Sequence, residues 1–412
     1  MVIIEFYDKT PLNNICGALL CQPEQVIFVG SNIDKMERGI EKFKTVLRNN
    51  NINTNLSYIC TDKNDLYSIV DKLSQIVEHF DDSCAFDITG GDELFLVAVG
   101  IVMEKYGEKV QCHRFNFNHN EIYDCDADGK VLDVKSFDIS IEDNISIYGG
   151  DIVTDHDEDF YTYFWDFNKD FLLDIESMWS ICRNNPKLWN AQINTLGAIC
   201  DSFEMTSPLQ IYFNQETARS VLYDSHDKYT LLPWMLSKFQ KCGLISSLYI
   251  DDIISFKFKN DQVKRCLTVA GQILELFIAK KMLSIKDTDG SPLYNDIKVG
   301  TVIRWGQSDD DDETSTVNEI DVIAMKGAIP VFISCKNGYF NANELYKLNT
   351  VADKFGNNYA KKVLVATDMS KLGTQGERLN ARMSDMGIKC IRDLDQMDDE
   401  TLENILASIW KD

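Results

Sequence analysis

The sequence predicts an α/β protein with more than one domain, on three observations. The chain has 412 residues, which is too long for a single domain with one ordinary hydrophobic core. Residues 1–115 alternate short apolar runs with amphipathic segments, which is the pattern of a parallel sheet covered by helices. A second α/β pattern with a different order of elements begins near residue 263. We therefore expect three parts, at residues 1–145, 146–262 and 263–412.

The first part is expected to form a doubly wound, Rossmann-like sheet. Its apolar runs are each short enough to be a buried strand, and amphipathic helical segments follow the second, third and fourth of them. A final hairpin is expected where Asp-Gly provides a tight turn. The expected strands are Val2–Tyr7, Gln25–Gly30, Asn53–Cys60, Cys84–Thr89 and Val110–Phe115, and the hairpin is Glu121–Phe137 with its turn at Asp128–Gly129.

The second part begins with an acidic, aromatic stretch, residues 140–168, that we interpret as a linker. Residues 169–203 are expected to be helical. A further helix at Leu231–Gly243, ending at a glycine, precedes a β-ribbon within residues 245–258, an order that resembles a winged helix. Winged helices bind DNA or serve as packing modules. The expected recognition helix has few basic residues, which favours the packing role.

The third part is expected to be a second α/β domain. A helix from Cys266 to about Leu283 precedes three strands, and alternating helices and strands follow. A turn at Gly327 makes the second and third of these strands an antiparallel hairpin. The acidic run Asp309–Glu313 is interpreted as a solvated hairpin tip. The expected strands are Ile297–Trp305, Glu319–Met325, Ile329–Cys335, Lys362–Thr367 and Ile388–Ile391, with helices at Ala342–Phe355 and Glu377–Met386.

Composition narrows the class of protein. The net charge of −24 argues against a protein that coats duplex nucleic acid, although residues 326–392 carry eleven Lys and Arg against five Asp and Glu. No apolar run reaches the roughly 20 residues of a membrane span, and the N-terminus lacks a signal peptide's basic start. The 12 cysteines include no C-x-x-C pair, so we expect free thiols, no zinc site and a cytoplasmic location.

Three polar loops follow strands of the first sheet, where an open α/β sheet binds ligands. Glycines in these loops would let the backbone approach a ligand, and a helix N-terminus favours phosphate. A tight turn is the plain alternative for Gly90–Gly91. Neither the glycine motif of dinucleotide-binding folds nor that of the P-loop is present, which disfavours a dinucleotide cofactor and an NTPase. The candidate ligand-binding residues are Asp8, Thr10, Pro11, Asn13, Gly30, Ser31, Asn32, Thr89, Gly90, Gly91 and Asp92.

The third part holds residues suited to metal-dependent phosphodiester hydrolysis. That chemistry needs carboxylates for Mg²⁺ or Mn²⁺ and a lysine near the attacking water. Glu275 on the first helix, Asp321 on one strand and Lys336 on the next could provide them. Ser334 and Lys336 share a strand face, as do Glu319 and Asp321. Lys336 as a surface lysine is the plain alternative, but an unpaired charge within an apolar strand is costly.

Four segments carry a resemblance to a known family. They are VIFVGSN (Val26–Asn32), FDITGGDELFLVAVG (Phe86–Gly100), NEIDV (Asn318–Val322) and FISCKNG (Phe332–Gly338). Together they resemble CRISPR ancillary nucleases, in which a CARF sensor domain is fused to a restriction-endonuclease-like domain of the PD-(D/E)xK type.

That resemblance implies an enzyme: a homodimer that binds a cyclic oligoadenylate, most often cyclic tetra-adenylate. Binding would activate Mn²⁺- or Mg²⁺-dependent cleavage of DNA, RNA or both in type III CRISPR antiviral defence. The family often has Glu-x-Lys where this chain has Ser334-x-Lys336, so we expect Glu319 to compensate.

Two other functions stay open. The chain could be a ligand-responsive regulator that binds nucleic acid and has an inactive nuclease fold, or its sensor could slowly cleave its own ligand. For the nuclease, we expect mostly neutral donors to hold the ring. We also expect the closing of the sensor dimer on the ring to reach the nuclease domains through the middle module.

Overall fold

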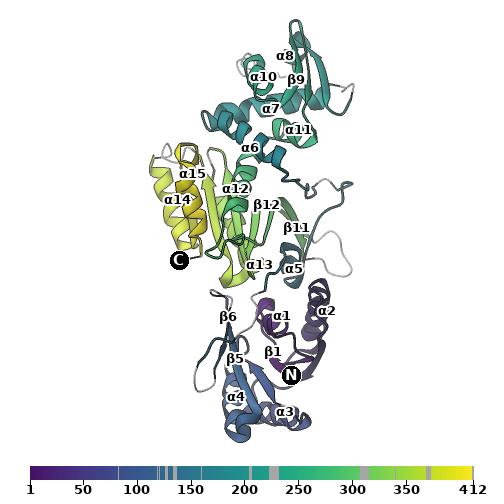
Figure 1. Ribbon diagram of the computed structural model, residues 1–412, viewed down its shortest axis with the longest axis vertical. Coiled ribbons are helices and arrows are strands. Elements are labelled where there is room, and N and C mark those ends of the chain that lie inside the picture. The colour runs from purple at the N-terminus through teal and green to yellow at the C-terminus, as the bar shows by residue number, and fades with distance from the viewer. Residues whose placement is uncertain are drawn as a thin grey trace.

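The computed structural model describes residues 1–412 except 82, 118, 120, 126–128, 133–136, 159, 204–206, 222–231, 307–314, 339, 368–372 and 411–412. Its three parts follow one another along the long axis of the molecule (Figure 1). The N-terminal domain lies at one end, the C-terminal domain lies in the middle, and the middle module of the sequence lies at the other end. The C-terminal domain therefore separates the other two.

The N-terminal domain is a doubly wound sheet with strand order β3-β2-β1-β4-β5-β6. All neighbouring strands are parallel except β5 and β6. The strand order reverses at β1, so the loops after β1, β2 and β4 meet at one edge. The strands are β1 (Val2–Phe6), β2 (Gln25–Gly30), β3 (Asn55–Cys60), β4 (Cys84–Asp87), β5 (Val110–Asn116) and β6 (Glu121–Asp124), and the helices are η1 (Pro11–Asn14), α1 (Cys16–Cys21), α2 (Ile33–Asn49), α3 (Leu66–His79), α4 (Glu93–Tyr106) and η2 (Gly107–Lys109).

The C-terminal domain is a mixed sheet with strand order β15-β14-β13-β12-β11-β7. The pairs β7–β11, β11–β12 and β12–β13 are antiparallel, and the pairs β13–β14 and β14–β15 are parallel. Its elements are α5 (Ile141–Ile147), β7 (Gly150–Ile152), α12 (Gln272–Ser284), β11 (Asp296–Trp305), β12 (Thr316–Lys326), β13 (Ile329–Lys336), α13 (Ala342–Gly356), η4 (Asn357–Tyr359), β14 (Lys361–Ala366), α14 (Gly373–Asp385), β15 (Ile388–Ile391), η6 (Leu394–Gln396) and α15 (Asp399–Ala407).

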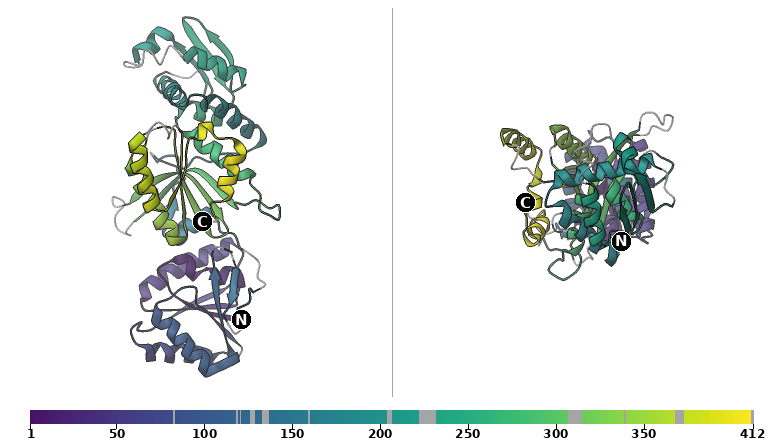
Figure 2. Two further views of the ribbon diagram at one scale, coloured as in Figure 1. Left: turned by 90° about the vertical axis from the view of Figure 1, so that its left-hand side faces the viewer. Right: turned by 90° about the horizontal axis from the view of Figure 1, so that it is seen from above.

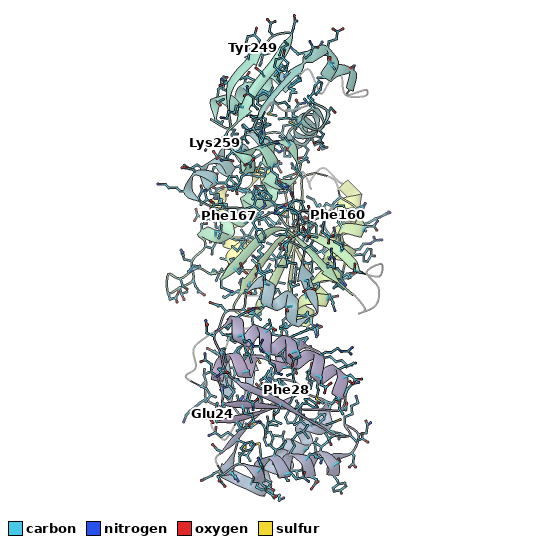
Figure 3. The ribbon with its side chains drawn as sticks, turned by 90° about the vertical axis from the view of Figure 1, so that its right-hand side faces the viewer. Glu24, Phe28, Phe160, Phe167, Tyr249 and Lys259 are labelled. Carbon is cyan, nitrogen blue, oxygen red and sulfur yellow. The ribbon has the colours of Figure 1, made fainter. Side chains whose placement is uncertain are left out.

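The middle module combines helices with a three-stranded antiparallel sheet of order β8-β10-β9. The expected ribbon is present as β9 and β10, and β8 adds a strand that the sequence analysis does not identify. Tyr249 on β9 lies near the end of the molecule far from Phe28, which is buried in the N-terminal domain (Figure 3). The elements are α6 (Lys169–Cys182), α7 (Pro186–Ser202), β8 (Gln210–Asn214), α8 (Gln215–Val221), α10 (Leu232–Lys241), β9 (Ile245–Ile250), β10 (Ile253–Phe258) and α11 (Asp261–Thr268).

Two apolar clusters hold the C-terminal sheet between its neighbours. On one face, residues of α12 and α15 pack with the middle module in a single cluster. On the other face, residues of α13, α14 and α5 pack with α1 and α2 of the N-terminal domain. Figure 2 shows the helices on both sides of this fan of strands. The second cluster is continuous and joins the N-terminal domain to α13 by direct packing.

The first part of the stretch 140–168 is not the irregular linker that we expect from the sequence. It forms α5 and strand β7, and Ile152 of β7 pairs with Ile303 of β11, whereas the described residues from 153 to 168 form no helix or strand. Thr162 then donates a hydrogen bond to the carbonyl of Val302 at 3.5 Å and accepts one from its amide at 2.9 Å. Elements of three to seven residues are too short to show a period in the sequence.

The helix expected from Cys266 to Leu283 is also different, because it is broken into α11 and α12. Gly271 lies between them with φ +98°, a conformation that only glycine adopts easily. Asp128 of the expected Asp-Gly turn, Leu231 at the start of the expected helix and the acidic run 309–313 lie outside the described residues. None of the helices in the described part of the chain has the length and apolar character that crossing a bilayer requires.

Candidate functional site

A pocket of about 700 Å³ opens at the edge of the N-terminal sheet where the polar loops meet. Six of the expected ligand-binding residues line it: Asp8, Thr10, Pro11, Ser31, Asn32 and Asp92. The N-terminus of α2 also faces this edge, where the Asn32 side chain caps the helix by accepting a hydrogen bond from the Lys35 amide at 2.9 Å. The strand order thus brings these six residues together at one edge of the sheet, and ligand binding there stays a prediction.

The pocket wall is more basic than the sequence analysis expects. Two acids in the wall, Asp8 and Asp92, face a larger set of basic side chains, and Lys63 pairs with Asp92 at 3.3 Å. The expectation that mostly neutral donors hold the ring stays a prediction, although this wall carries five basic side chains against two acidic ones. A spacing of three and four residues along α2 places three of the cations on one helix face, a signal that the sequence contains. The basic residues of the wall are Lys9, Lys35, Arg38, Lys42 and Lys63.

The pKa of Lys42 shows that these positive charges crowd one another. Burial and the positive charges of Lys354 and Arg38 lower it, while Asp151 opposes the shift. Lys354 belongs to α13 of the C-terminal domain, so the repulsion acts between the two domains. A bound anion would relieve this repulsion, which makes the pocket suited to phosphate groups.

The other five expected ligand-binding residues support the loops and do not line the pocket. The amide of Gly91 donates to Asp8 Oδ2 at 3.2 Å, and a Cβ at position 90 would lie 2.9 Å from that of Asp8. A Cβ on Gly30 would collide with Met36. Close packing therefore explains these glycines. The five residues are Asn13, Gly30, Thr89, Gly90 and Gly91.

Thr89 joins two strands at the end of β4. Its hydroxyl donates to Asp87 Oδ1 and accepts a hydrogen bond from the Phe115 amide at 2.7 Å. Asp87 itself is fully buried beside Glu5, its partner in the β1–β4 register. Burial and the neighbouring Asp87 raise the pKa of Glu5 well above its ordinary value. These acids form a polar layer inside the sheet, beneath the loops.

The C-terminal domain contributes directly to this pocket. Asn357, which follows α13, lines the wall and donates a hydrogen bond to Thr10 Oγ1 at 2.9 Å. Two residues later, the Tyr359 hydroxyl donates to Asn13 Oδ1 at 3.2 Å, and its ring packs on Phe117. The middle module lies at the far end of the molecule (Figure 1). The expected signal path through the middle module stays a prediction, and the contacts of the pocket with the C-terminal domain include η4, which directly follows α13.

The candidate catalytic residues meet on adjacent strands of the C-terminal sheet. Val322 of β12 pairs with Ile333 of β13, so Asp321 and Ser334 lie opposite each other. Asp321 Oδ2 accepts hydrogen bonds from Ser334 Oγ at 3.1 Å, the Cys335 amide at 2.6 Å and Lys336 Nζ at 3.2 Å. The sequence predicted the neighbourhood of Asp321, Ser334 and Lys336 from strand period and the Gly327 turn.

A second carboxylate, which the sequence analysis does not single out, holds Lys336. Glu344 in the first turn of α13 places its Oε2 3.0 Å from Lys336 Nζ. Burial lowers the pKa of Lys336, but Asp321 and Glu344 outweigh it, and the pKa lies above its ordinary value. Lys336 is therefore a charged, half-buried ammonium group between two carboxylates.

A cavity of about 20 Å³ lies at this point, enough for one water-sized occupant. Glu319 lines it, as expected, but Glu275 is not among its lining residues. Glu275 stands in the first turn of α12, on the opposite face of the sheet from α13. Its pKa is raised well above the ordinary value by burial and then by the charges of Asp321 and Glu319. The three carboxylates thus influence one another. The cavity is lined by Glu319, Ile320, Asp321, Ile333, Ser334, Lys336, Glu344, Lys347 and Leu348.

The donor set fits a divalent metal ion in kind. Carboxylate and hydroxyl oxygens are ligands that Mg²⁺ and Mn²⁺ prefer, and burial, followed by the negative charges of Asp321 and Glu319, raises the pKa of Glu275. No group of three metal-ligating side chains is drawn together within the described ranges of the chain. Lys336 Nζ occupies the space between two of the oxygens. Metal binding would therefore require the side chains to rearrange around the ion.

Asn337, which immediately follows Lys336, fixes the end of β13. Its side chain donates to Asn190 Oδ1 of α7 at 2.9 Å and accepts from Thr367 Oγ1 at 2.9 Å. From the sequence, Asn337-Gly338 reads as a plain turn. In the structure the turn is present, with Gly338 at φ +107°, and Asn337 also attaches the middle module beside the carboxylate site.

Comparison with known proteins supports this fold over the whole chain. No family model matches the sequence, and no curated protein matches it. Among the solved structures that match, two align with this chain over nearly their whole length. Protein VC1899 from Vibrio cholerae matches with a TM-score of 0.75 and 18% identity, covering 100% of this chain and 98% of that one. Can2 from Sulfobacillus thermosulfidooxidans, solved in complex with cyclic tetra-adenylate, matches with a TM-score of 0.64 and 14% identity, covering 100% and 97%. The chain is similar to these two proteins in its whole fold.

Proposed function

We propose that this protein is a metal-dependent nuclease of type III CRISPR defence that a cyclic oligoadenylate activates. One observation carries the proposal: Asp321, Ser334 and Lys336 meet at a water-sized cavity in a chain that also has a basic ligand pocket. The fold similarity to Can2, a protein solved with cyclic tetra-adenylate, supports the same activator for this pocket.

The ring would bind in the basic pocket of the N-terminal domain. Its phosphates would face the cations of α2, and its riboses the loop residues Thr10 and Asn32. A symmetric ring presents equal halves to two equal pockets, so the proposed active form is a homodimer. Sedimentation with and without cyclic tetra-adenylate tests this arrangement.

The cleavage site would be the carboxylate cluster. Asp321 would hold Mn²⁺ or Mg²⁺ together with further carboxylates of the cluster, and Glu319 and Glu275 are the candidates that the sequence predicts. The metal would supply electrostatic stabilisation of the phosphate and would activate a water. Lys336 would lie beside the attacking water or the scissile phosphate. Asp321 and Glu344 keep its ammonium group charged, so it could stabilise negative charge there. The substrate would be a DNA or RNA strand.

Activation would pass along α13. This helix is about 22 Å long at 1.5 Å per residue, with Glu344 near its first end and Asn357 just beyond its last. Anion binding near Lys42 would weaken its repulsion with Lys354 and allow that end of α13 to shift. A rigid helix would then carry the shift to Lys336 through Glu344.

The experiment is to incubate the protein and Mn²⁺ with labelled DNA and RNA, with and without each cyclic oligoadenylate. Cleavage that needs both the metal and one ring supports the proposal. Chromatography of the ring in the same reactions shows whether the N-terminal domain degrades it.

The second candidate is a ligand-responsive regulator without nuclease activity. Ser334, in place of an acid, is the observation that favours it. Ring-dependent binding of nucleic acid without cleavage, in Mn²⁺ and in Mg²⁺, would select this function over the first.

A further inference from the structure

The strand that carries Lys336 lacks an acid at the position two residues before it. Ser334 is there, and its hydroxyl donates to Asp321 Oδ2 at 3.1 Å. That oxygen also accepts from the Cys335 amide and from Lys336. With three donors on one carboxylate oxygen, Asp321 needs a second carboxylate from elsewhere if a divalent cation is to be held here.

Glu344 comes from the helix that covers this face of the sheet. Ile323 of β12 and Phe332 of β13 belong to the apolar cluster beneath α13. Side chains two residues apart on a strand share a face, so Asp321 and Ser334 also face α13. The start of α13 is fixed by Asn341, whose side chain accepts a hydrogen bond from the Asn343 amide at 2.8 Å. Glu344 is thereby aimed at the cavity that Asp321, Ser334 and Lys336 line.

We propose that Glu344 supplies the carboxylate that position 334 lacks and binds the divalent cation together with Asp321. This inference rests on the nuclease function proposed above. Lys336 Nζ, at 3.0 Å from Glu344 and 3.2 Å from Asp321, marks the point where one cation faces both carboxylates. With those oxygens on a metal ion, Lys336 would be free to face the substrate phosphate.

Glu319 is the competing source of the missing carboxylate. It lines the same cavity but is an exposed residue on β12. The ion pairs that the structure gives Lys336 run to Asp321 and Glu344. Glu344 is therefore better placed to act with Asp321 on one cation.

The test compares Glu344→Gln, Ser334→Glu and the double variant in the full-length protein. Free Mn²⁺ is measured by electron paramagnetic resonance during titration, and ring-stimulated cleavage is measured in parallel. Glu344→Gln should weaken Mn²⁺ binding about 10- to 100-fold, with a matching loss of cleavage. Adding Ser334→Glu should restore both, because it returns a carboxylate to the strand. Asp321→Asn is the control that Ser334→Glu should not rescue.

Three results would overturn the inference. They are unchanged Mn²⁺ binding by Glu344→Gln, a double variant that binds Mn²⁺ as weakly as Glu344→Gln, and a Ser334→Glu change that rescues Glu319→Gln but not Glu344→Gln. A purely orienting role for Glu344 would lower cleavage but leave the Mn²⁺ titration unmoved. Ser334 is buried, so Ser334→Asp replaces Ser334→Glu if thermal unfolding shows that the longer side chain is not accommodated. If the unmodified protein binds Mn²⁺ but cleaves nothing, the proposed function fails while the titration still decides the role of Glu344.

Discussion

Asn357 of the C-terminal domain donates a hydrogen bond to Thr10 Oγ1 of the N-terminal domain at 2.9 Å, inside the wall of the ligand pocket. The same segment continues to Tyr359, whose hydroxyl bonds Asn13. These two contacts join the loop after β1 to the end of α13. They place the proposed sensor one helix away from the carboxylate site, and four predictions follow from that layout and from the two sites.

Removing the contact of Tyr359 should uncouple the ring from cleavage. Tyr359→Phe keeps the ring stacked on Phe117 but deletes the hydrogen bond to Asn13. We expect ring affinity within about fivefold of the unmodified protein, since one neutral hydrogen bond contributes about 1 kcal/mol, and a larger loss of ring-stimulated cleavage. Tyr346→Phe, at an exposed position of the preceding helix α13, is the control. Equal stimulation of both variants would remove this contact from the activation path.

Removing basic residues from α2 should weaken ring binding. Arg38→Ala and Lys35→Ala each delete a cation from the pocket wall, and a charge-assisted contact to phosphate contributes about 1.5–3 kcal/mol, so we expect a loss of tenfold or more for each. Isothermal calorimetry with cyclic tetra-adenylate at two salt concentrations measures both the loss and its salt dependence. Lys44→Ala is the matched control, because Lys44 pairs with Glu41 and is not among the pocket-lining residues. Undiminished binding by Arg38→Ala and Lys35→Ala would place the ring elsewhere.

Removing Asp321 or Lys336 should abolish cleavage and leave ring binding intact. Both side chains lie in the carboxylate site, and neither lines the ligand pocket. We expect Asp321→Ala and Lys336→Ala to lose at least about 100-fold in cleavage rate, since each removes a group that would contact the metal or the phosphate. Calorimetry should give ring affinities equal to that of the unmodified protein. Cleavage near the normal rate by either variant would show that the active site lies elsewhere.

Neutralising Glu5 should stabilise the N-terminal domain most at high pH. Burial and Asp87 raise the pKa of Glu5, so the folded state binds its proton more tightly than the unfolded state does. Between the unfolded pKa near 4.3 and the raised folded pKa, stability therefore falls as pH rises. Glu5→Gln removes this term, and Tm should increase by roughly 2–4 °C for each kcal/mol recovered, more at pH 8 than at pH 5. Glu24→Gln, at an exposed carboxylate, should leave Tm and its pH dependence unchanged.

The sequence determined the local structure because local structure depends on short-range pattern. Apolar runs such as Gln25–Gly30 and Ile329–Lys336 are strands in the structure, and the Gly327 turn set Asp321 beside Ser334. The order of the strands placed Thr10 and Asn32 at one pocket. Short elements such as β7 lay below what a period can reveal, and Gly271 broke a helix that the apolar pattern alone would continue.

Only the tertiary structure decided what completes each site. Glu344 lies eight residues beyond Lys336 on another element, and Asn357 is separated from Thr10 by most of the chain. Their positions depend on how α13 packs between the sheet and the N-terminal domain, which is a property of the shared apolar cluster and not of any one segment. Side chains brought together by such packing have no common spacing along the chain. Asp321 and Lys336 could thus be identified from the sequence, whereas Glu344 at one end of α13 and Asn357 just beyond the other were identified only from the fold.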